Sequence, residues 1–144
     1  MGGRAIALLA QRRTSHVNIV DHNLEPRDEW RPGVMPRMRV SARIGATQVC
    51  LFEQWCDPGL GAPTHYHAVE EVLSVMAGEA EVWVGPERAT ITAGQSVVIP
   101  AGIAHGFRNA GTATLHVQAT LASPVFEAAY DDKRETPRRR SATT

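Results

Sequence analysis

Long hydrophobic runs are missing from this 144-residue sequence. No apolar stretch approaches the roughly 18 residues that a membrane-spanning helix requires. The apolar run near the start, residues 5–10, is followed at once by Gln-Arg-Arg, and it is shorter than the roughly 7–15 residues of a secretory signal. We therefore expect a cytoplasmic protein that has no membrane partner.

Cysteine is also scarce, and Cys50 and Cys56 are the two in the chain. Both fall in VCLFEQWC, a predicted strand, in which about 20 Å would separate them. A disulfide needs Cα atoms within about 7 Å, and neither residue belongs to a CxxC motif. This spacing argues against a disulfide, gives no support for a thiolate metal site, and is consistent with a reducing compartment.

An excess of charge of one sign is absent, because 15 Lys and Arg balance 15 Asp and Glu. The charge of the whole chain therefore points neither to nucleic acid nor to an anionic membrane. The exception is KRETPRRRSATT at the C-terminus, with five basic residues and one acidic residue. We expect residues 131–144 to be a disordered basic tail, and binding of nucleic acid or another partner is the less favoured alternative.

Helical periodicity is almost absent, and alternation takes its place. In RMRVSARI, residues 37–44, apolar and polar side chains alternate, which is typical of a strand with one wet face. The later short runs, each bounded by turn-forming residues, are THYH, EEVLSVMA, EAEVWVG, RATI, SVVIP, HGFRN and TLHVQATL. This pattern predicts an all-β sandwich or barrel over residues 37–130, after an irregular arm, residues 1–36, anchored by Trp30. A short helix is expected within PVFEAAYDD, residues 124–132.

Two histidines stand one residue apart in GAPTHYHAVEEV, at His65 and His67. On a strand they share a face, and Glu71 has the same parity. A fourth candidate, His105, begins a strand after a turn in PAGIAHGFRN. Three imidazoles and one carboxylate suit one divalent metal ion (Fe, Mn, Ni, Zn or Cu) and leave room for a small ligand. The alternative is that the histidines are solvated on a wet strand face.

The spacing around these residues resembles that of the cupin family. Residues 59–78 match the first cupin motif as Gly59-x5-His65-x-His67-x3-Glu71-x6-Gly78. Residues 94–109 match the second as Gly94-x5-Pro100-x-Gly102-x2-His105-x3-Asn109. The resemblance implies a small jelly-roll barrel that holds a divalent metal through His65, His67, Glu71 and His105 at one mouth. It also implies a homodimer, since cupins of this size commonly form one.

Other residues are candidates for a substrate pocket. Phe107 is the best of them, because it shares parity with His105. His116 and Gln118 alternate along TLHVQATL and could line the cavity, although a solvated position is favoured. A basic stripe, made of Arg37, Arg39 and Arg43, is interpreted as a solvated edge, with binding of a substrate carboxylate as the alternative.

The predicted function is metal-dependent chemistry on a small molecule, without nucleic acid as a partner. Dioxygenase-like oxidation of an enol, a catechol or a similar oxygen-chelating substrate is the first choice, with Glu71 as a base in addition to its role as a ligand. The alternatives are a non-redox isomerase or lyase and a non-catalytic binder of a small ligand. No GxSxG, glycine-rich phosphate loop or Rossmann fingerprint supports other chemistry.

Overall fold

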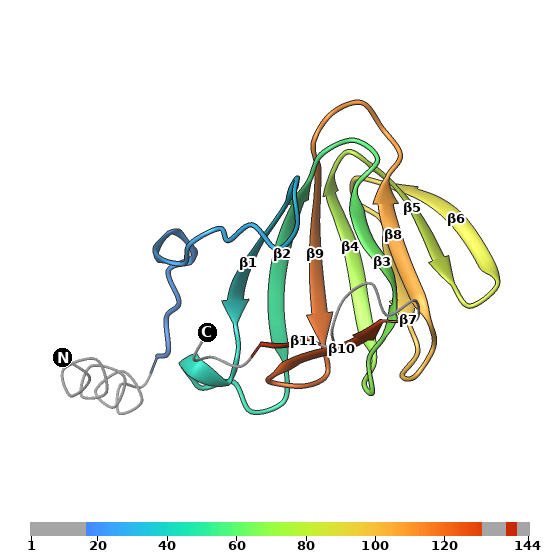
Figure 1. Ribbon diagram of the computed structural model, residues 1–144. Helices are drawn as coiled ribbons and strands as arrows, with labels where there is room; N and C mark the ends of the chain where they lie inside the picture. The colour runs from blue at the N-terminus through green and yellow to red at the C-terminus, as the bar shows by residue number, and fades with distance from the viewer. Residues whose placement is uncertain (1–16, 131–137, 141–144) are drawn as a thin grey trace.

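The strands of this protein form two antiparallel sheets (Figure 1). A computed structural model describes residues 17–130 and 138–140. The strands in these residues are β1 (Val34–Val40), β2 (Cys50–Cys56), β3 (Gly61–Tyr66), β4 (Glu71–Ala77), β5 (Glu79–Val84), β6 (Glu87–Thr92), β7 (Ser96–Ile99), β8 (His105–Asn109), β9 (Leu115–Leu121), β10 (Phe126–Tyr130) and β11 (Arg138–Arg140). The short 3₁₀ helices η1 (His22–Leu24) and η2 (Ala42–Ile44) accompany them. The predicted all-β architecture is confirmed.

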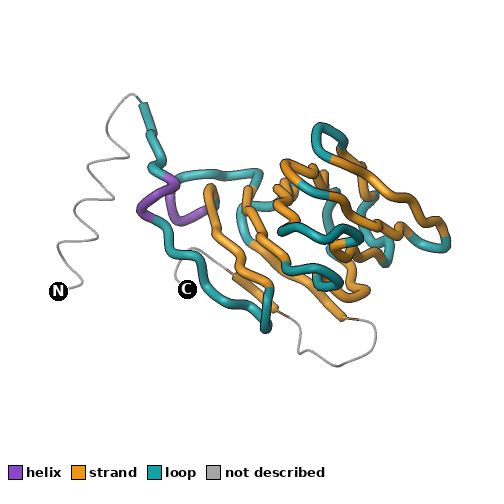
Figure 2. The backbone as a smooth tube through the Cα atoms, turned by 90° about the horizontal axis from the view of Figure 1, so that it is seen from above, coloured by secondary structure: helices purple, strands orange, loops and turns teal. Residues whose placement is uncertain are grey.

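The order of the strands differs from their order in the chain. One sheet runs β1-β2-β9-β4-β7 and the other runs β11-β10-β3-β8-β5-β6. Consecutive strands such as β3 and β4 therefore lie in different sheets, and the chain passes from one sheet to the other between them. Figure 2, seen from above, shows the strands curving around a common interior. A short sequence segment can thus place side chains on both walls of that interior.

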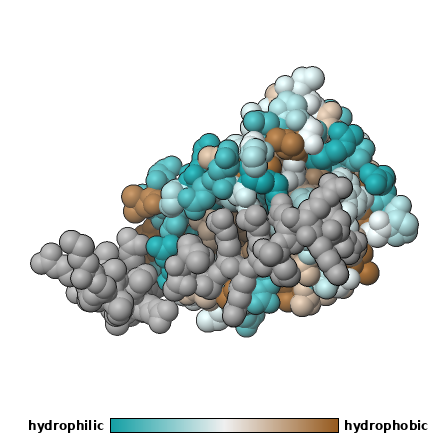
Figure 3. Space-filling model, viewed as in Figure 1, coloured by the Kyte–Doolittle hydropathy of each residue, from teal (hydrophilic) through white to brown (hydrophobic). Residues whose placement is uncertain are grey.

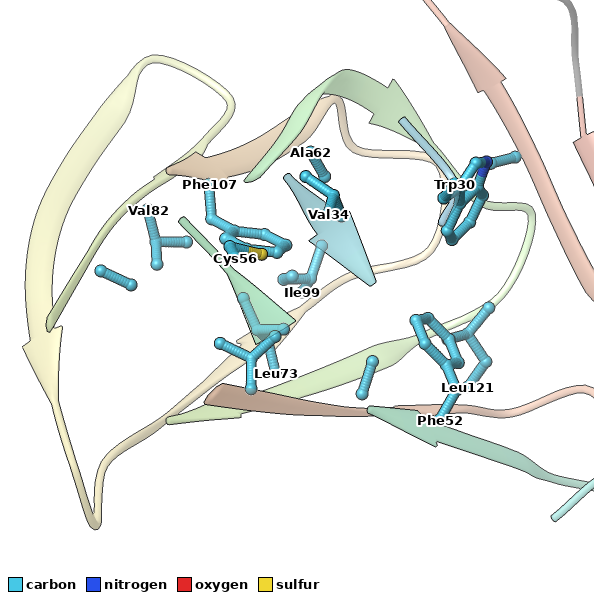
Figure 4. Close-up of a cluster of buried hydrophobic side chains, with 14 of the residues drawn as sticks. Trp30, Val34, Phe52, Cys56, Ala62, Leu73, Val82, Ile99, Phe107 and Leu121 are labelled. Carbon is cyan, nitrogen blue, oxygen red and sulfur yellow. The ribbon is translucent and has the colours of Figure 1, made fainter. Parts of the chain in front are cut away.

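The core follows from the alternation of side chains along each strand. In β9, Leu115, Val117, Ala119 and Leu121 are buried, and the residues between them are half-buried. Aromatic side chains join the two sheets, with Phe126 packed edge-on at 5.3 Å from the ring of Phe52. The close-up in Figure 4 shows Phe52, Phe107 and Leu121 within this apolar interior.

The N-terminal arm contributes to the same core. Trp30 is buried, as expected of an anchor, and its ring lies 5.0 Å from that of Phe126. The first strand begins at Val34, inside the stretch predicted to be irregular, and it ends at Val40, before the predicted end at residue 44. Pro36 is tolerated because β1 is an edge strand, where one side of the backbone needs no ladder hydrogen bond.

The helix predicted within residues 124–132 is wrong. Residues Phe126–Tyr130 form β10, in which Phe126, Ala128 and Tyr130 are buried while Glu127 is exposed. This period of two marks a strand with one apolar face, and pairing of Ala129 with Tyr66 of β3 fixes it at the sheet. Of the tail predicted to be disordered, residues 131–144, the structure describes Arg138–Arg140, which form β11 paired with β10. The rest of the tail lies outside the described residues.

Cys50 and Cys56 are buried and unpaired at the two ends of β2, as predicted. Burial raises the pKa of the Cys50 thiol to about 11 and that of Cys56 to about 12, so both thiols stay protonated and unreactive.

In the described part of the chain, no helix has the length and apolar character to cross a membrane. Where the face in Figure 3 is coloured by hydropathy, hydrophilic residues predominate over scattered hydrophobic ones, which agrees with an apolar interior.

Candidate metal centre

The crossing from one sheet to the other brings the four predicted ligands together. His65 lies on β3 directly opposite His105 of β8, its cross-strand partner. His67 follows the end of β3, and Glu71 begins β4 in the facing sheet. The ring of His105 lies 4.3 Å from that of His65 and 5.3 Å from that of His67, measured between centroids. The two motif segments therefore converge as the sequence pattern predicts.

All four side chains are buried, and one potential ligand atom from each lies within 4.8 Å of the others. Exposed acidic clusters are common in proteins without a metal, but buried groups of this kind need a compensating partner. Three imidazoles with a carboxylate form a mixed nitrogen and oxygen donor set, which first-row divalent metals favour. The cluster can hold a metal ion.

Hydrogen bonds to the backbone orient all three imidazoles. Each histidine directs its Nδ1 to a carbonyl oxygen, which fixes the proton on Nδ1. The acceptors are Pro63 O for His65 (2.6 Å), Glu127 O for His67 (2.5 Å) and Ile103 O for His105 (2.8 Å). In this tautomer Nε2 carries a lone pair, and a hydrogen bond from the other nitrogen is the usual support of a metal-bound histidine.

The atoms at the centre need a positive charge between them. Glu71 Oε2 lies 3.2 Å from His67 Nε2 and 3.2 Å from His105 Nε2. His67 Nε2 is buried and forms no hydrogen bond within the described part of the chain, and its short contact with the carboxylate lacks hydrogen-bond geometry. Lone pairs of nitrogen and oxygen facing one another at this distance repel unless a proton or a metal ion stands between them. The residues therefore fit a divalent metal.

The electrostatics of the cluster favour the protonation states that bind metals at two of its groups, His65 and Glu71. Burial lowers the pKa of His65 to about 4, and the charges of His105 and His67 act in the same direction. Burial alone would raise the pKa of Glu71, but its contacts with His105 and His67 outweigh burial and lower it to about 2. Burial also disfavours charge on His105, but Glu71 outweighs it and raises that pKa. At neutral pH Glu71 is a carboxylate and His65 is neutral, as ligation requires.

A carboxylate with so low a pKa is a weak base. The observed contacts of Glu71 therefore support its role as a ligand, and its role as a base stays a prediction.

A small cavity adjoins the four ligands. Aromatic side chains form much of its wall, from Trp30, Phe52, Phe107, Phe126 and Tyr130, and its polar lining outside the ligands comes from Arg31 and Gln54. Its free volume is about 10 Å³, which is close to the space of one water molecule. Phe107 lines this cavity, as its parity with His105 predicted.

His116 and Gln118 do not line this cavity. Inward positions of β9 belong to its apolar residues, so these two polar side chains lie on the outer face of the five-stranded sheet. There His116 stacks on Trp55, with ring centroids 4.6 Å apart, and its Nε2 lies 3.0 Å from Glu53 Oε1. Gln118 Oε1 accepts a hydrogen bond from Arg39.

Two arginines of the basic stripe, Arg37 and Arg39, belong to that outer face as well. Arg37 donates to Glu53 Oε2 at 2.9 Å, and Arg39 lies 3.6 Å from Glu53 Oε1. Arg43 lies on η2 and is 3.8 Å from Glu25. These arginines therefore have carboxylate partners within the protein and lie away from the cavity.

Sequence reasoning missed several residues of the cavity, among them Gln54, Tyr130 and Arg31. Gln54 has the parity of Phe52 on β2, so alternation could have found it once the inward face was known. Tyr130 was hidden by the predicted helix. Arg31 lies in the arm before β1, where no periodic signal exists.

Comparison with known proteins agrees with this architecture. Residues 54–121 match the family model described as the cupin domain. This chain contains a cupin domain. The match includes all four candidate ligands and both sequence motifs, residues 59–78 and 94–109. No curated protein matches the sequence.

Solved structures share the cupin fold. Oxalate decarboxylase from Lactobacillus farciminis, in a formate complex, has a TM-score of 0.70 at 20% identity, covering 77% of this chain and 35% of that one. Oxalate decarboxylase from Bacillus subtilis, described with Mn(II) centres, has a TM-score of 0.68 at 16% identity, covering 78% of this chain and 31% of that one. An RmlC-like cupin from Shewanella frigidimarina has a TM-score of 0.63 at 22% identity, covering 83% and 96%. The chain spans about a third of the length of the two decarboxylases, and at these identities the likeness concerns the fold.

Proposed function

We propose that this cupin is a metal-dependent enzyme acting on a small molecule that binds the metal through oxygen. The observation that carries the proposal is the buried donor set of four side chains. A backbone carbonyl oxygen orients each imidazole through Nδ1, which leaves Nε2 as the nitrogen that can bind the metal. When bound, a divalent metal supplies Lewis acidity and, if it is redox-active, electron transfer. His65, His67, Glu71 and His105 would hold one such ion.

The protein's own contribution is a dry and confined setting. Phe52, Phe107 and Phe126 line the cavity and exclude water from the ligands, which strengthens electrostatic interactions within it. The free volume of about 10 Å³ limits what can enter without rearrangement, so the substrate is small. An aromatic catechol would need the cavity to open, whereas a compact enol or hydroxy acid needs less displacement.

Dioxygenase-like oxidation is the first reaction class that we propose, because the donor set suits Fe and Mn as well as Zn. A non-redox lyase or isomerase is the second candidate. The size of the cavity favours it, since a confined site accommodates one small ligand more readily than a substrate together with oxygen. The Mn(II) centres of the oxalate decarboxylase from Bacillus subtilis are consistent with this second candidate.

Metal analysis of protein purified without oxygen tests the proposal. We expect about one divalent metal per chain in the wild type and almost none in His67→Ala. Turnover that consumes oxygen identifies the oxidative class, and turnover that is independent of oxygen identifies the non-redox class. A wild-type protein that binds no metal, or a His67→Ala variant that keeps full occupancy, would count against the metal enzyme. Metal binding without any turnover would leave a non-catalytic ligand-binding cupin.

We further propose a homodimer formed through the outer face of the five-stranded sheet. A mostly apolar row crosses this face in register, through Val40, Leu51, Thr120, Val72 and Val98. At its end Val98 is 59% exposed, which makes it an accessible apolar contact. Sedimentation is expected to show a dimer that Val98→Lys weakens. A wild type that stays monomeric at all concentrations would remove the homodimer.

A further inference from the structure

The cavity beside the candidate metal centre carries a cation that neither cupin motif contains. Arg31, in the arm before β1, lines this cavity together with the four ligands. Its Nη1 donates to Gly61 O on β3 at 3.2 Å, and its Nη2 donates to the Tyr130 hydroxyl on β10 at 3.3 Å. Because β3 and β10 are neighbouring strands, these bonds hold the guanidinium across the boundary between them.

Ring contacts fix the same side chain. The guanidinium carbon of Arg31 lies 5.2 Å from the ring centroid of Trp30 and 5.9 Å from that of Tyr130. The Tyr130 ring in turn lies 5.6 Å from that of the ligand His65. Figure 4 shows Trp30 beside the apolar interior. Arg31 is thus positioned by stacking and by hydrogen bonds, at the side of the cavity that adjoins His65.

A second polar group faces the cavity from the opposite sheet. Gln54 of β2 is 4% exposed, and its Oε1 is buried and accepts no hydrogen bond from any residue that the structure describes. A buried amide oxygen without a donor destabilises the folded protein, so such a group in a native protein calls for an explanation. An O–H or N–H donor on a bound ligand would satisfy it.

The charge of the lining favours an anion. Among the described residues that line the cavity, Glu71 is the one acid and Arg31 is the one residue with a permanent positive charge. A divalent metal at the four ligands would leave the cavity with net positive charge. Arginine recognises carboxylates through its planar set of N–H donors, and an aromatic wall strengthens that interaction by excluding water.

We propose that this site takes a small 2-hydroxycarboxylate or a similar small hydroxy acid. Arg31 binds the carboxylate and Gln54 accepts the hydroxyl proton in a hydrogen bond, while ligand oxygens face the metal. The inference rests on the proposed metal centre and names the substrate class of that site. A ligand of this kind exceeds the free volume of about 10 Å³, so its carboxylate replaces Tyr130 or Gly61 as a partner of Arg31 when it enters.

The test uses glycolate as the probe, with acetate, which lacks the hydroxyl, and glycolamide, which lacks the charge. Binding is measured by calorimetry on protein loaded with one equivalent of Zn²⁺ and on metal-free protein, after metal content has been determined for each variant. Wild type is expected to bind glycolate more tightly than acetate or glycolamide. Arg31→Gln is expected to weaken glycolate binding about tenfold or more and to leave glycolamide binding unchanged.

Three further variants separate charge, hydrogen bonding and folding. Arg31→Lys keeps the charge and should recover part of the affinity for glycolate. Gln54→Leu should weaken glycolate binding about threefold to tenfold and leave acetate binding unchanged. Arg88→Gln is the matched control, because Arg88 lies on β6 and pairs with Glu81 on the surface. It should bind glycolate as the wild type does.

The outcomes distinguish the anion site from the metal centre. A protein that binds Zn²⁺ but binds glycolate equally well with Arg31→Gln, or does not bind glycolate at all, overturns the anion site and leaves the metal centre standing. A protein that takes up no metal but loses glycolate binding in Arg31→Gln overturns the metal centre and supports the anion site. Acetate binding as tight as glycolate binding overturns the role of Gln54.

Discussion

His65 and His105 are direct cross-strand partners on β3 and β8, with ring centroids 4.3 Å apart. Forty residues of sequence separate them, yet their distance is set by the spacing of two neighbouring strands. Glu71 reaches them from the facing sheet, where its Oε2 lies 3.2 Å from His105 Nε2. The centre is therefore assembled by topology, and each ligand depends on the register of its strand.

Replacing His105 should remove the metal. In His105→Ala the cluster loses one imidazole and the partner of the Glu71 carboxylate, so we expect metal content to fall from about one per chain to near zero. His116→Ala is the matched control, because His116 belongs to neither cupin motif and lies on the outer face of β9. Metal analysis after dialysis provides the measurement. Equal loss of metal in both variants would contradict the assignment.

Gly61 sets the separation between the two strands that carry histidines. A Cβ added at this position would lie 2.2 Å from the backbone oxygen of Phe107 on β8. Backbone atoms cannot yield as the end of a flexible side chain can, so Gly61→Ala should push β3 away from β8. We expect a loss of about 2 kcal/mol or more in the free energy of unfolding, together with weaker metal binding.

Gly111→Ala is the control for that substitution. An added Cβ there would meet its nearest atom, Asn109 Oδ1, at an ordinary 3.5 Å. We expect a change of less than about 0.5 kcal/mol and normal metal content. Urea unfolding and metal analysis of both variants provide the comparison. The role of Gly61 would be refuted if its substitution proved as harmless as that of Gly111.

Local patterns predicted which four side chains converge, because His65 and His67 alternate at the end of β3 and the cupin-like spacing grouped Glu71 and His105 with them. The apolar alternation of β9 also favoured a solvated position for His116 and Gln118. The structure buries the apolar residues of β9 and places these two side chains on the outer face. The strand at Phe126–Tyr130 was missed because a five-residue apolar alternation, taken alone, resembles one turn of helix. Its pairing with β3 shows that this segment is a strand.

Arg31 shows a different limit of sequence patterns. It lies in a segment without periodicity, and its approach to the cavity depends on Trp30 packing against Phe126, a contact across almost 100 residues of chain. The basic stripe had a stronger local signal, yet its arginines pair with Glu53 on the outer face. Local patterns do not encode the tertiary packing that places Arg31 at the cavity and keeps Arg37 and Arg39 on the outer face.

Glu53 should make folding stability depend on pH. Burial alone would raise the pKa of this carboxylate, but hydrogen bonds from Arg37 and His116 and the charge of Arg39 outweigh burial and lower it below its ordinary 4.5. Above pH 4.5 both the folded and the unfolded states carry the charge, so the stabilisation is fully present. As pH falls from 4.5 through the lower folded value, the unfolded state binds a proton first and the stabilisation is lost.

The variant Glu53→Gln isolates this contribution. At neutral pH it should be less stable than the wild type by about 1–3 kcal/mol, because Arg37 and His116 lose a charged partner. That deficit should shrink as the pH falls below 4.5. Metal-free proteins are compared, so that titration of His65 and Glu71 is common to both and cancels in the difference.

Glu81→Gln, at a surface ion pair with Arg88, is the control and is expected to change stability by less than about 1 kcal/mol at neutral pH. A deficit for Glu53→Gln that stays constant with pH would show that the carboxylate charge is not what stabilises this face of the sheet.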